Sequence, residues 1–141
     1  MWYAGHWLME SVRQVYGFYA ECMRKYGDAS VWRAFTDLFD FLCVSAVIDD
    51  AIFCVHAGLS PSVLTIEQIS VLDRFHEVPP DGALADLVWS DPDTLREGFN
   101  QSNRGAGYTF GADIAERFLH VNNMDHICEC RASPVSTLVA L

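Results

Sequence analysis

The sequence predicts a mixed α/β or α+β layer fold, because its hydrophobic period changes twice along the chain. Apolar residues recur at helical spacing between residues 14 and 42, residues 44–55 form two short β-branched runs, and helical spacing returns from residue 65. Helices that are followed by paired strands and then by further helices pack as layers around a shared core. The 141 residues fit one domain.

Two helices are predicted in the first part of the chain. The first covers residues 14–26 and is stopped by Gly27, and the second covers about residues 31–42 with Ser30 as its N-cap. Each helix has an apolar stripe at helical spacing, and we expect the stripe of the second helix to be buried. The stripe residues are Val15, Phe18, Tyr19, Cys22, Met23 and Tyr26 in the first helix and Val31, Trp32, Phe35, Leu38, Phe39 and Leu42 in the second.

A β-hairpin is predicted next, because the β-branched runs Val44–Ile48 and Ala51–Val55 flank the dipeptide Asp49-Asp50. A helix is expected to begin near Thr65, which forms a capping-box pair with Gln68. Residues 75–111 hold most of the prolines and glycines and are interpreted as long ordered loops.

The last predicted elements are a helix and a strand. The helix covers about residues 112–121 and is expected to bury Ile114, Phe118 and Val121. The strand covers Asp125–Cys128.

Composition excludes several classes of function. The net charge is −10, so the chain lacks the basic patches that bind nucleic acid or an anionic membrane. No stretch is long and apolar enough to span a bilayer, and residues 1–10 do not have a signal-peptide pattern. The 5 cysteines, an odd number without a secretion signal, predict reduced thiols in the cytoplasm or the nucleus.

Two positions have the residue types and settings of a chemical site. His56 ends an apolar run before a glycine-containing turn, where an imidazole can bind a divalent metal or transfer a proton. Arg104 lies between Ser102 and Tyr108 beside two glycines, which let the backbone approach an anion that the guanidinium binds. The alternatives are a histidine bonded to the backbone and an arginine in a structural salt bridge.

Other candidates match known sites poorly. His126, Cys128 and Cys130 do not have the spacing of a zinc finger or ribbon, and the sequence has no second ligand pair. Trp89 is interpreted as a buried tryptophan that leads into a turn. Four aspartates are interpreted as ordinary turn residues: Asp49, Asp50, Asp91 and Asp93.

Several collinear segments resemble the phosphoprotein phosphatases, and in particular their 2A-like branch. The match is nearly gapless from about Gln14 to Ile127. The segments that carry it are Val15-Tyr16-Gly17-Phe18-Tyr19, Phe35-Thr36-Asp37-Leu38-Phe39-Asp40, Ile52-Phe53-Cys54-Val55-His56, Gly58-Leu59-Ser60-Pro61, Leu72-Asp73-Arg74, Glu77-Val78-Pro79, Asp86-Leu87-Val88-Trp89-Ser90-Asp91-Pro92 and Arg104-Gly105-Ala106-Gly107-Tyr108.

The resemblance implies a metallophosphoesterase fold, a β-sandwich flanked by helices. It implies hydrolysis of phosphoserine and phosphothreonine by a water that two divalent metal ions activate, with manganese expected and iron or zinc as alternatives. By the same resemblance, His56 matches a metal ligand and Arg104 matches the arginine that binds the phosphate. Phosphoprotein substrates and regulatory or scaffold subunits are the implied partners of the complete enzyme.

The N-terminal segment departs from the family pattern. Family members take further metal ligands from Asp-x-His, Gly-Asp-x-Val-Asp-Arg and Gly-Asn-His-Glu segments, of which the first two have no counterpart here. The third is expected just before Gln14, where residues 1–13 are divergent. An ungapped register places His6 and Trp7 on its Asn-His pair and a gapped register places Met9 on the histidine, so neither register restores the pair.

The C-terminal segment departs as well. The family continues Arg-Ala-His-Gln-Leu, with the histidine as a metal ligand, whereas Arg131-Ala132 is followed here by Ser133-Pro134-Val135. A one-base shift within the alanine codon converts codons for Ala-His-Gln-Leu into codons for Ala-Ser-Pro-Val. We therefore interpret residues 129–141 as an out-of-frame or alternatively spliced tail.

Two classes of function follow. In the first, residues 1–141 form a single partial catalytic domain of a protein serine/threonine phosphatase. Because His56 is the one family metal ligand in place, we expect this chain to bind no metal stably and to be inactive by itself. In the alternative, the chain is a non-catalytic product that binds phosphatase regulatory subunits.

Overall fold

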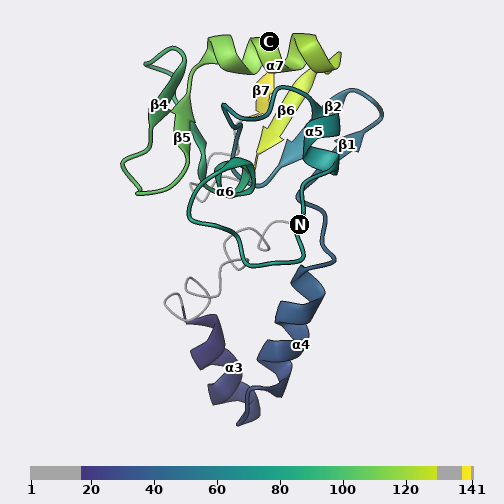
Figure 1. Cartoon of the computed structure of the whole chain (residues 1–141), viewed down its shortest axis with the longest axis vertical. Helices are drawn as coiled ribbons and strands as arrows, with labels where there is room; N and C mark the ends of the chain where they lie inside the picture. The colour runs from purple at the N-terminus through teal and green to yellow at the C-terminus, as the bar shows by residue number, and fades with distance from the viewer. Residues whose placement is uncertain (1–16, 130–137, 141) are drawn as a thin grey trace. The chain divides into compact units, whose positions relative to one another are not determined.

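The computed structural model describes residues 17–129 and 138–140 and divides into two compact units. Among the described residues, unit 1 holds 17–43 and 73–78, and unit 2 holds the rest. Figure 1 labels most elements of both units. None of the helices in the described ranges is long and apolar enough to cross a membrane. The divergent segment 1–13 lies outside the described residues.

Unit 1 is a pair of helices, α3 (Phe18–Tyr26) and α4 (Ser30–Phe39). Gly27 ends α3 in the left-handed conformation, with φ at 80°, and its N–H donates to the Met23 carbonyl. Aromatic rings join the two helices edge to face: Phe18 and Phe35 have centroids 5.6 Å apart, and Tyr19 and Trp32 have centroids 5.3 Å apart.

The helices of unit 1 are confirmed, but two details of the prediction are wrong. Ser30 is not the N-cap, because α4 begins at Ser30 and the Asp28 carboxylate accepts its backbone N–H at 2.6 Å. The predicted stripe of α4 is not buried, since α4 has no buried residue and Leu38 is 51% exposed. Tyr26 of α3 is also exposed, because ring contacts between two helices cover only the facing side chains.

Unit 2 is built around a four-stranded sheet in the order β1-β2-β6-β7. Its strands are β1 (Ser45–Ile48), β2 (Ile52–Val55), β6 (His126–Glu129) and β7 (Leu138–Ala140). The hairpin β1–β2 is confirmed, and Asp49 and Asp50 both have φ of 52°, as a type I′ turn requires. β2 pairs with β6 in parallel, and the other neighbours pair antiparallel.

The segment interpreted as a tail overlaps this sheet. Glu129 ends β6 and is buried, and the backbone of β7 pairs with β6. Residues 130–137 and 141 lie outside the described residues. The genetic origin of residues 129–141 stays a prediction.

A second sheet of three short strands and three helices complete unit 2. The strands are β3 (Asp91–Pro92), β4 (Phe99–Gln101) and β5 (Tyr108–Phe110), in the order β3-β5-β4. The helices are α5 (Ile66–Ser70), α6 (Ala83–Trp89) and α7 (Ala112–Asn122). The predicted helices at Thr65 and at residues 112–121 are confirmed, including the Thr65–Gln68 capping box.

The interpretation of residues 75–111 as loops is wrong, because this range contains α6 and the whole second sheet. Five consecutive residues of α6, from Leu84 to Val88, are buried. A helix that is buried on all sides has no amphipathic period, and the prolines and glycines around it indicate turns. The helix therefore leaves no periodic signal in the sequence.

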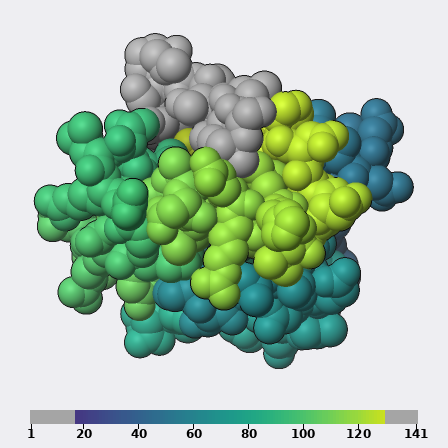
Figure 2. All heavy atoms as spheres, turned by 90° about the horizontal axis from the view of Figure 1, so that it is seen from above, coloured from purple at the N-terminus to yellow at the C-terminus, as the bar shows by residue number. Residues whose placement is uncertain are grey.

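The hydrophobic core of unit 2 joins the first sheet to α7. Phe53 and Ile127 from neighbouring strands and Phe118 and Leu119 from α7 are all at most 3% exposed. α7 lies across the face shown in Figure 2, with residues of the second sheet on one side and the β1–β2 hairpin on the other. Val121, predicted to be buried, is 43% exposed because it lies on the outer side of α7.

Candidate functional site

His56 directly follows β2, at the end of a strand of the core. The loop after it is fixed against α6: the Ala57 N–H donates to the Leu87 carbonyl at 3.1 Å. A Cβ on Gly58 would lie 2.8 Å from the Ser90 carbonyl oxygen and would overlap the Phe110 ring. Glycine at position 58 is therefore needed for this loop to reach the end of α6.

A buried polar pair fixes the same loop from within. The Ser60 hydroxyl donates to the Asp86 carboxylate at 2.6 Å and accepts the Ser62 N–H at 3.1 Å. Both Ser60 and Asp86 are 2% exposed. Burial raises the pKa of Asp86, the bond from Ser60 lowers it, and the nearby charge of Asp81 raises it further. The balance is a raised pKa.

Ser90, which is fully buried, lies between the two predicted site segments. Its hydroxyl accepts the Tyr108 N–H at 3.0 Å, and a Cβ on Gly107 would lie 2.8 Å from its backbone nitrogen. Gly107 also has φ of 69°, which favours glycine. Because Gly58 and Gly107 both approach Ser90, the structure brings the His56 loop and the Arg104 loop to one segment at the end of α6.

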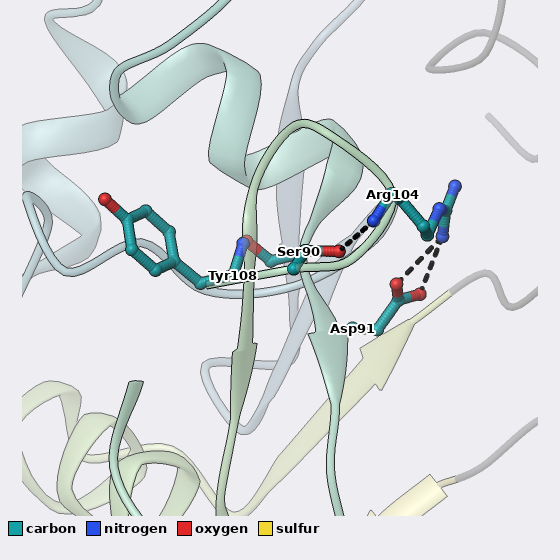
Figure 3. Close-up of polar contacts among 5 residues, drawn as sticks. Ser90, Asp91, Arg104 and Tyr108 are labelled. Atoms are coloured by element: carbon teal, nitrogen blue, oxygen red, sulfur yellow. Dashed lines mark hydrogen bonds and ion pairs between the residues drawn. The ribbon is translucent and has the colours of Figure 1, made fainter. Parts of the chain in front are cut away.

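Arg104 is held by two neighbours of Ser90. Its Nη1 donates to both carboxylate oxygens of Asp91, at 3.0 and 2.9 Å, and its guanidinium lies over the Trp89 ring at 5.2 Å from the centroid. Figure 3 shows the guanidinium directed toward Asp91, while the Tyr108 ring points the other way. The Arg104 side chain is 43% exposed, so its remaining N–H groups can reach a ligand from solvent.

Sequence reasoning missed the two residues that position Arg104. Asp91 was interpreted as a turn aspartate and Trp89 as a buried tryptophan, whereas Asp91 is in β3 and Trp89 is half-buried beneath the guanidinium. The expected alternative of a structural salt bridge is present, as the Asp91 contact shows. This ion pair is compatible with a role in anion binding, because one carboxylate engages only one of the guanidinium nitrogens.

The described residues do not form a complete metal site. No group of three or more histidine, cysteine, aspartate or glutamate side chains within residues 17–129 is placed to hold a metal ion. A stable divalent metal centre needs several preorganised ligands. Among the described residues, His56 is therefore not part of a cluster that could hold a metal ion by itself.

Comparisons with known proteins place this geometry in a family. Residues 9–129 match the model of the calcineurin-like phosphoesterases. The chain is 64% identical over 116 residues to a protein phosphatase 2A catalytic subunit of Dictyostelium discoideum, a match that covers 82% of this chain and 37% of the relative. A putative serine/threonine-protein phosphatase of Schizosaccharomyces pombe is 62% identical over 116 residues, covering 82% of this chain and 38% of the relative.

A solved structure agrees with the fold. A protein serine/threonine phosphatase from Saccharomyces cerevisiae matches with a TM-score of 0.80 and 32% identity, over 92% of this chain and 40% of that one. The chain thus spans less than half the length of the relatives it matches. The metallophosphoesterase fold and the resemblance to 2A-like phosphoprotein phosphatases are confirmed. The family implies divalent metal ions. This chain belongs to the calcineurin-like phosphoesterase family.

Proposed function

We propose that this chain carries the phosphate-binding part of a protein serine/threonine phosphatase, with Arg104 as the residue that contacts the phosphoryl group. The observation that carries the proposal is the position of Arg104, which is oriented by Asp91 and Trp89 and remains accessible from solvent. Its partners restrict the rotamers of a long side chain before a ligand arrives, which lowers the entropy cost of binding.

The proposed substrates are phosphoserine and phosphothreonine residues of proteins in the cytoplasm or nucleus. A guanidinium binds phosphate oxygens through paired N–H donors and stays charged at every physiological pH. Charge that develops on the phosphoryl oxygens during transfer is stabilised by such a preorganised donor. Arg104 therefore supports both binding of the phosphoprotein and the reaction step.

His56 is proposed as one ligand of the divalent metal centre that the family implies. Two such ions, when bound, activate the attacking water and bind the phosphoryl oxygens. Manganese is the proposed metal, with iron or zinc as alternatives. Because the described residues supply too few ligands, we propose that this chain does not turn over substrate alone.

The first experiment measures binding to the chain itself. Titration with a phosphoserine peptide should shift the amide resonances of residues 102–108, and the unphosphorylated peptide should not. Arg104→Ala should abolish the shifts. Arg117→Ala, on the exposed side of α7, is the matched control for loss of one positive charge and should leave them unchanged. Equal effects of the two variants would show that only net charge matters.

The second experiment separates the two proposed roles in a completed enzyme. The segments of the Dictyostelium relative that lie outside the match are fused to this chain, and metal content and turnover are measured together. His56→Ala should lower metal occupancy and nearly abolish turnover. Arg104→Ala should keep the metal and lose a factor on the order of 10²–10³ in rate, as for removal of one oxyanion donor. Loss of metal in Arg104→Ala would refute the assignment.

A non-catalytic binding role is the second candidate, and the surface of unit 1 favours it. Tyr26, Leu38 and Phe41 are 57%, 51% and 68% exposed, an unusual density of large apolar side chains for one small unit. A purified regulatory or scaffold subunit of a 2A-type phosphatase should then bind the chain. Leu38→Ser should weaken the binding, whereas Val71→Ser, at an 81% exposed position of unit 2, should not.

A further inference from the structure

Two cysteines of the first sheet are direct neighbours on adjacent strands. Cys54 in β2 and Cys128 in β6 occupy the same register position of the parallel pair. Their strand neighbours Phe53, Val55 and Ile127 are buried toward the core. Because side chains alternate along a strand, Cys54 and Cys128 both point to the opposite face of the sheet.

The two thiols are close enough to react with each other. The register of the parallel strands places the Cα atoms of Cys54 and Cys128 directly opposite each other. Adjacent strands lie about 4.8 Å apart, which is inside the range of roughly 4.4–6.8 Å between the Cα atoms of disulfide-bonded cysteines. Both cysteines are free and only half-buried, so that a small oxidant can reach them.

We propose that Cys54 and Cys128 form a dithiol site that closes to an intrachain disulfide under hydrogen peroxide. The peroxide oxidises one thiol to a sulfenic acid and is itself reduced to water. The sulfur of the second thiol then displaces the hydroxyl group, which leaves as water with the second thiol's proton. In total two S–H bonds and the O–O bond break, one S–S bond and two O–H bonds form, and two electrons pass from the sulfurs to the peroxide, which leaves as two water molecules.

The bond formed at this site is readily reversible. The spacing of about 4.8 Å between adjacent strands is slightly larger than the usual Cβ separation of roughly 3.5–4.5 Å in a disulfide, so a bond between directly paired residues is strained. A disulfide under strain is more easily reduced by a thiol. The site therefore suits a modification that forms in an oxidising episode and is removed afterwards.

The test is a tryptic peptide map of the oxidised chain. The positions of arginine and lysine determine which cysteines share a peptide. Trypsin leaves Cys54 in the peptide of residues 34–74, which also holds Cys43, and leaves Cys128 in the peptide of residues 118–131, which also holds Cys130. The Cys43→Ser/Cys130→Ser variant removes both ambiguities. After peroxide treatment and alkylation of the remaining thiols, the two peptides should be recovered as one cross-linked species that is two hydrogen atoms lighter than their sum.

Three observations decide the proposal. The cross-link should disappear on addition of dithiothreitol, and it should be absent from both Cys54→Ser and Cys128→Ser made in the same background. It should also form in a monomer at high dilution, as non-reducing gel electrophoresis shows. A cross-link found only in dimers, or oxidation of the two cysteines to separate sulfinic acids, would overturn the proposal. Either serine variant suffices if the other fails to fold.

Discussion

Unit 1 and unit 2 both have many apolar residues, but they differ greatly in how many of these side chains are buried. Among the described residues, unit 1 buries only Cys22 and Val78, while unit 2 has a continuous core around Phe53, Leu87 and Phe118. Unit 1 consists of helices that meet through a few ring contacts. Unit 2 packs helices against sheets, which covers apolar side chains from several directions.

The difference shows that a periodic apolar stripe predicts a helix more reliably than it predicts burial. The stripe of α4 formed the expected helix, yet Phe35 and Leu38 remain exposed. Local spacing determines which side chains share a face, whereas burial requires another element opposite that face. Mutations that remove apolar volume should therefore have unequal effects in the two units.

The largest expected effect is that of Phe53→Ala in unit 2. Phe53 is fully buried, and its ring centroid lies 5.0 Å from that of Phe118. Removing a buried aromatic ring leaves a cavity and should lower the free energy of unfolding by about 3–5 kcal/mol. Urea denaturation followed by far-UV circular dichroism measures the loss.

The matched substitution in unit 1 is Leu38→Ala on α4. Leu38 is 51% exposed, and alanine favours the helix, so that the free energy of unfolding should change by less than about 1 kcal/mol. If Leu38→Ala costs as much as Phe53→Ala, the contrast between the two units is wrong.

A smaller effect is expected where glycine permits close packing. Gly107→Ala adds a Cβ that would lie 2.8 Å from the Ser90 nitrogen, at a φ of 69°. Gly98 has φ of 70° but open space around its Cβ position. Gly98→Ala should cost about 1–2 kcal/mol for the left-handed backbone alone, and Gly107→Ala should cost more, because the backbone of Ser90 must also move.

Thermal unfolding of both glycine variants measures this difference. A smaller loss for Gly107→Ala than for Gly98→Ala would show that the Arg104 loop does not depend on its contact with Ser90. Unit 1 offers a further control in Gly27, which has φ of 80° and open space, so Gly27→Ala should resemble Gly98→Ala.

The sequence predicted the elements whose signals are local. The hairpin at Asp49-Asp50 and the capping box at Thr65 follow from a few adjacent residues, and both are present. Helix α6 was missed because it carries no amphipathic period: other elements bury five consecutive residues of it, Asp86 included. The short strands of the second sheet have two or three residues each, too few for an alternating pattern.

In the candidate site, too, residues with a local sequence signal were predicted and residues that come together only through packing were not. His56 and Arg104 were identified because each lies in a segment with its own glycine pattern. Asp91 and Trp89 could not be assigned to Arg104, since both contacts join residues that are far apart in the sequence, 13 positions in the case of Asp91. The pairing of Ser60 with Asp86 spans 26 positions and was missed for the same reason. Which residues surround a site is a property of the packing.

A pH dependence of stability is expected from Asp86 in unit 2. Burial raises the pKa of its carboxyl above the ordinary 3.8, so the folded state binds a proton more tightly than the unfolded state. The stabilisation of the folded state by this tighter proton binding is fully present below the pKa of Asp86 in the unfolded state. It is lost as the pH rises through the pKa in the folded state. The free energy of unfolding should therefore fall with rising pH above about 3.8 through this group.

Asp86→Asn isolates this contribution, because an amide does not titrate and can still accept the Ser60 hydroxyl. The difference in unfolding free energy between the parent and Asp86→Asn should change with pH in the direction stated, favouring the parent at the acidic end. A difference that is constant across this pH range, or one that favours the parent more as the pH rises, would contradict the raised pKa.

The smallest effect on stability is expected at the ion pair that orients Arg104. The ion pair of Arg104 with Asp91 is partly exposed, at 43% and 26% of the two side chains. Pairs of this kind contribute about 0–1 kcal/mol, because solvent screens the charges and ordering the side chains costs entropy. Asp91→Asn should therefore leave the unfolding midpoint almost unchanged.

The same substitution should nevertheless weaken binding of a phosphoserine peptide, since it releases the guanidinium from the orientation that Asp91 fixes. Trp89→Leu should act in the same direction by removing the ring beneath the guanidinium. If peptide affinity falls in Asp91→Asn while stability is retained, Asp91 acts through Arg104. If affinity rises instead, the carboxylate competes with phosphate for the same N–H groups, and Arg104 is then a structural partner of Asp91 that a ligand must displace.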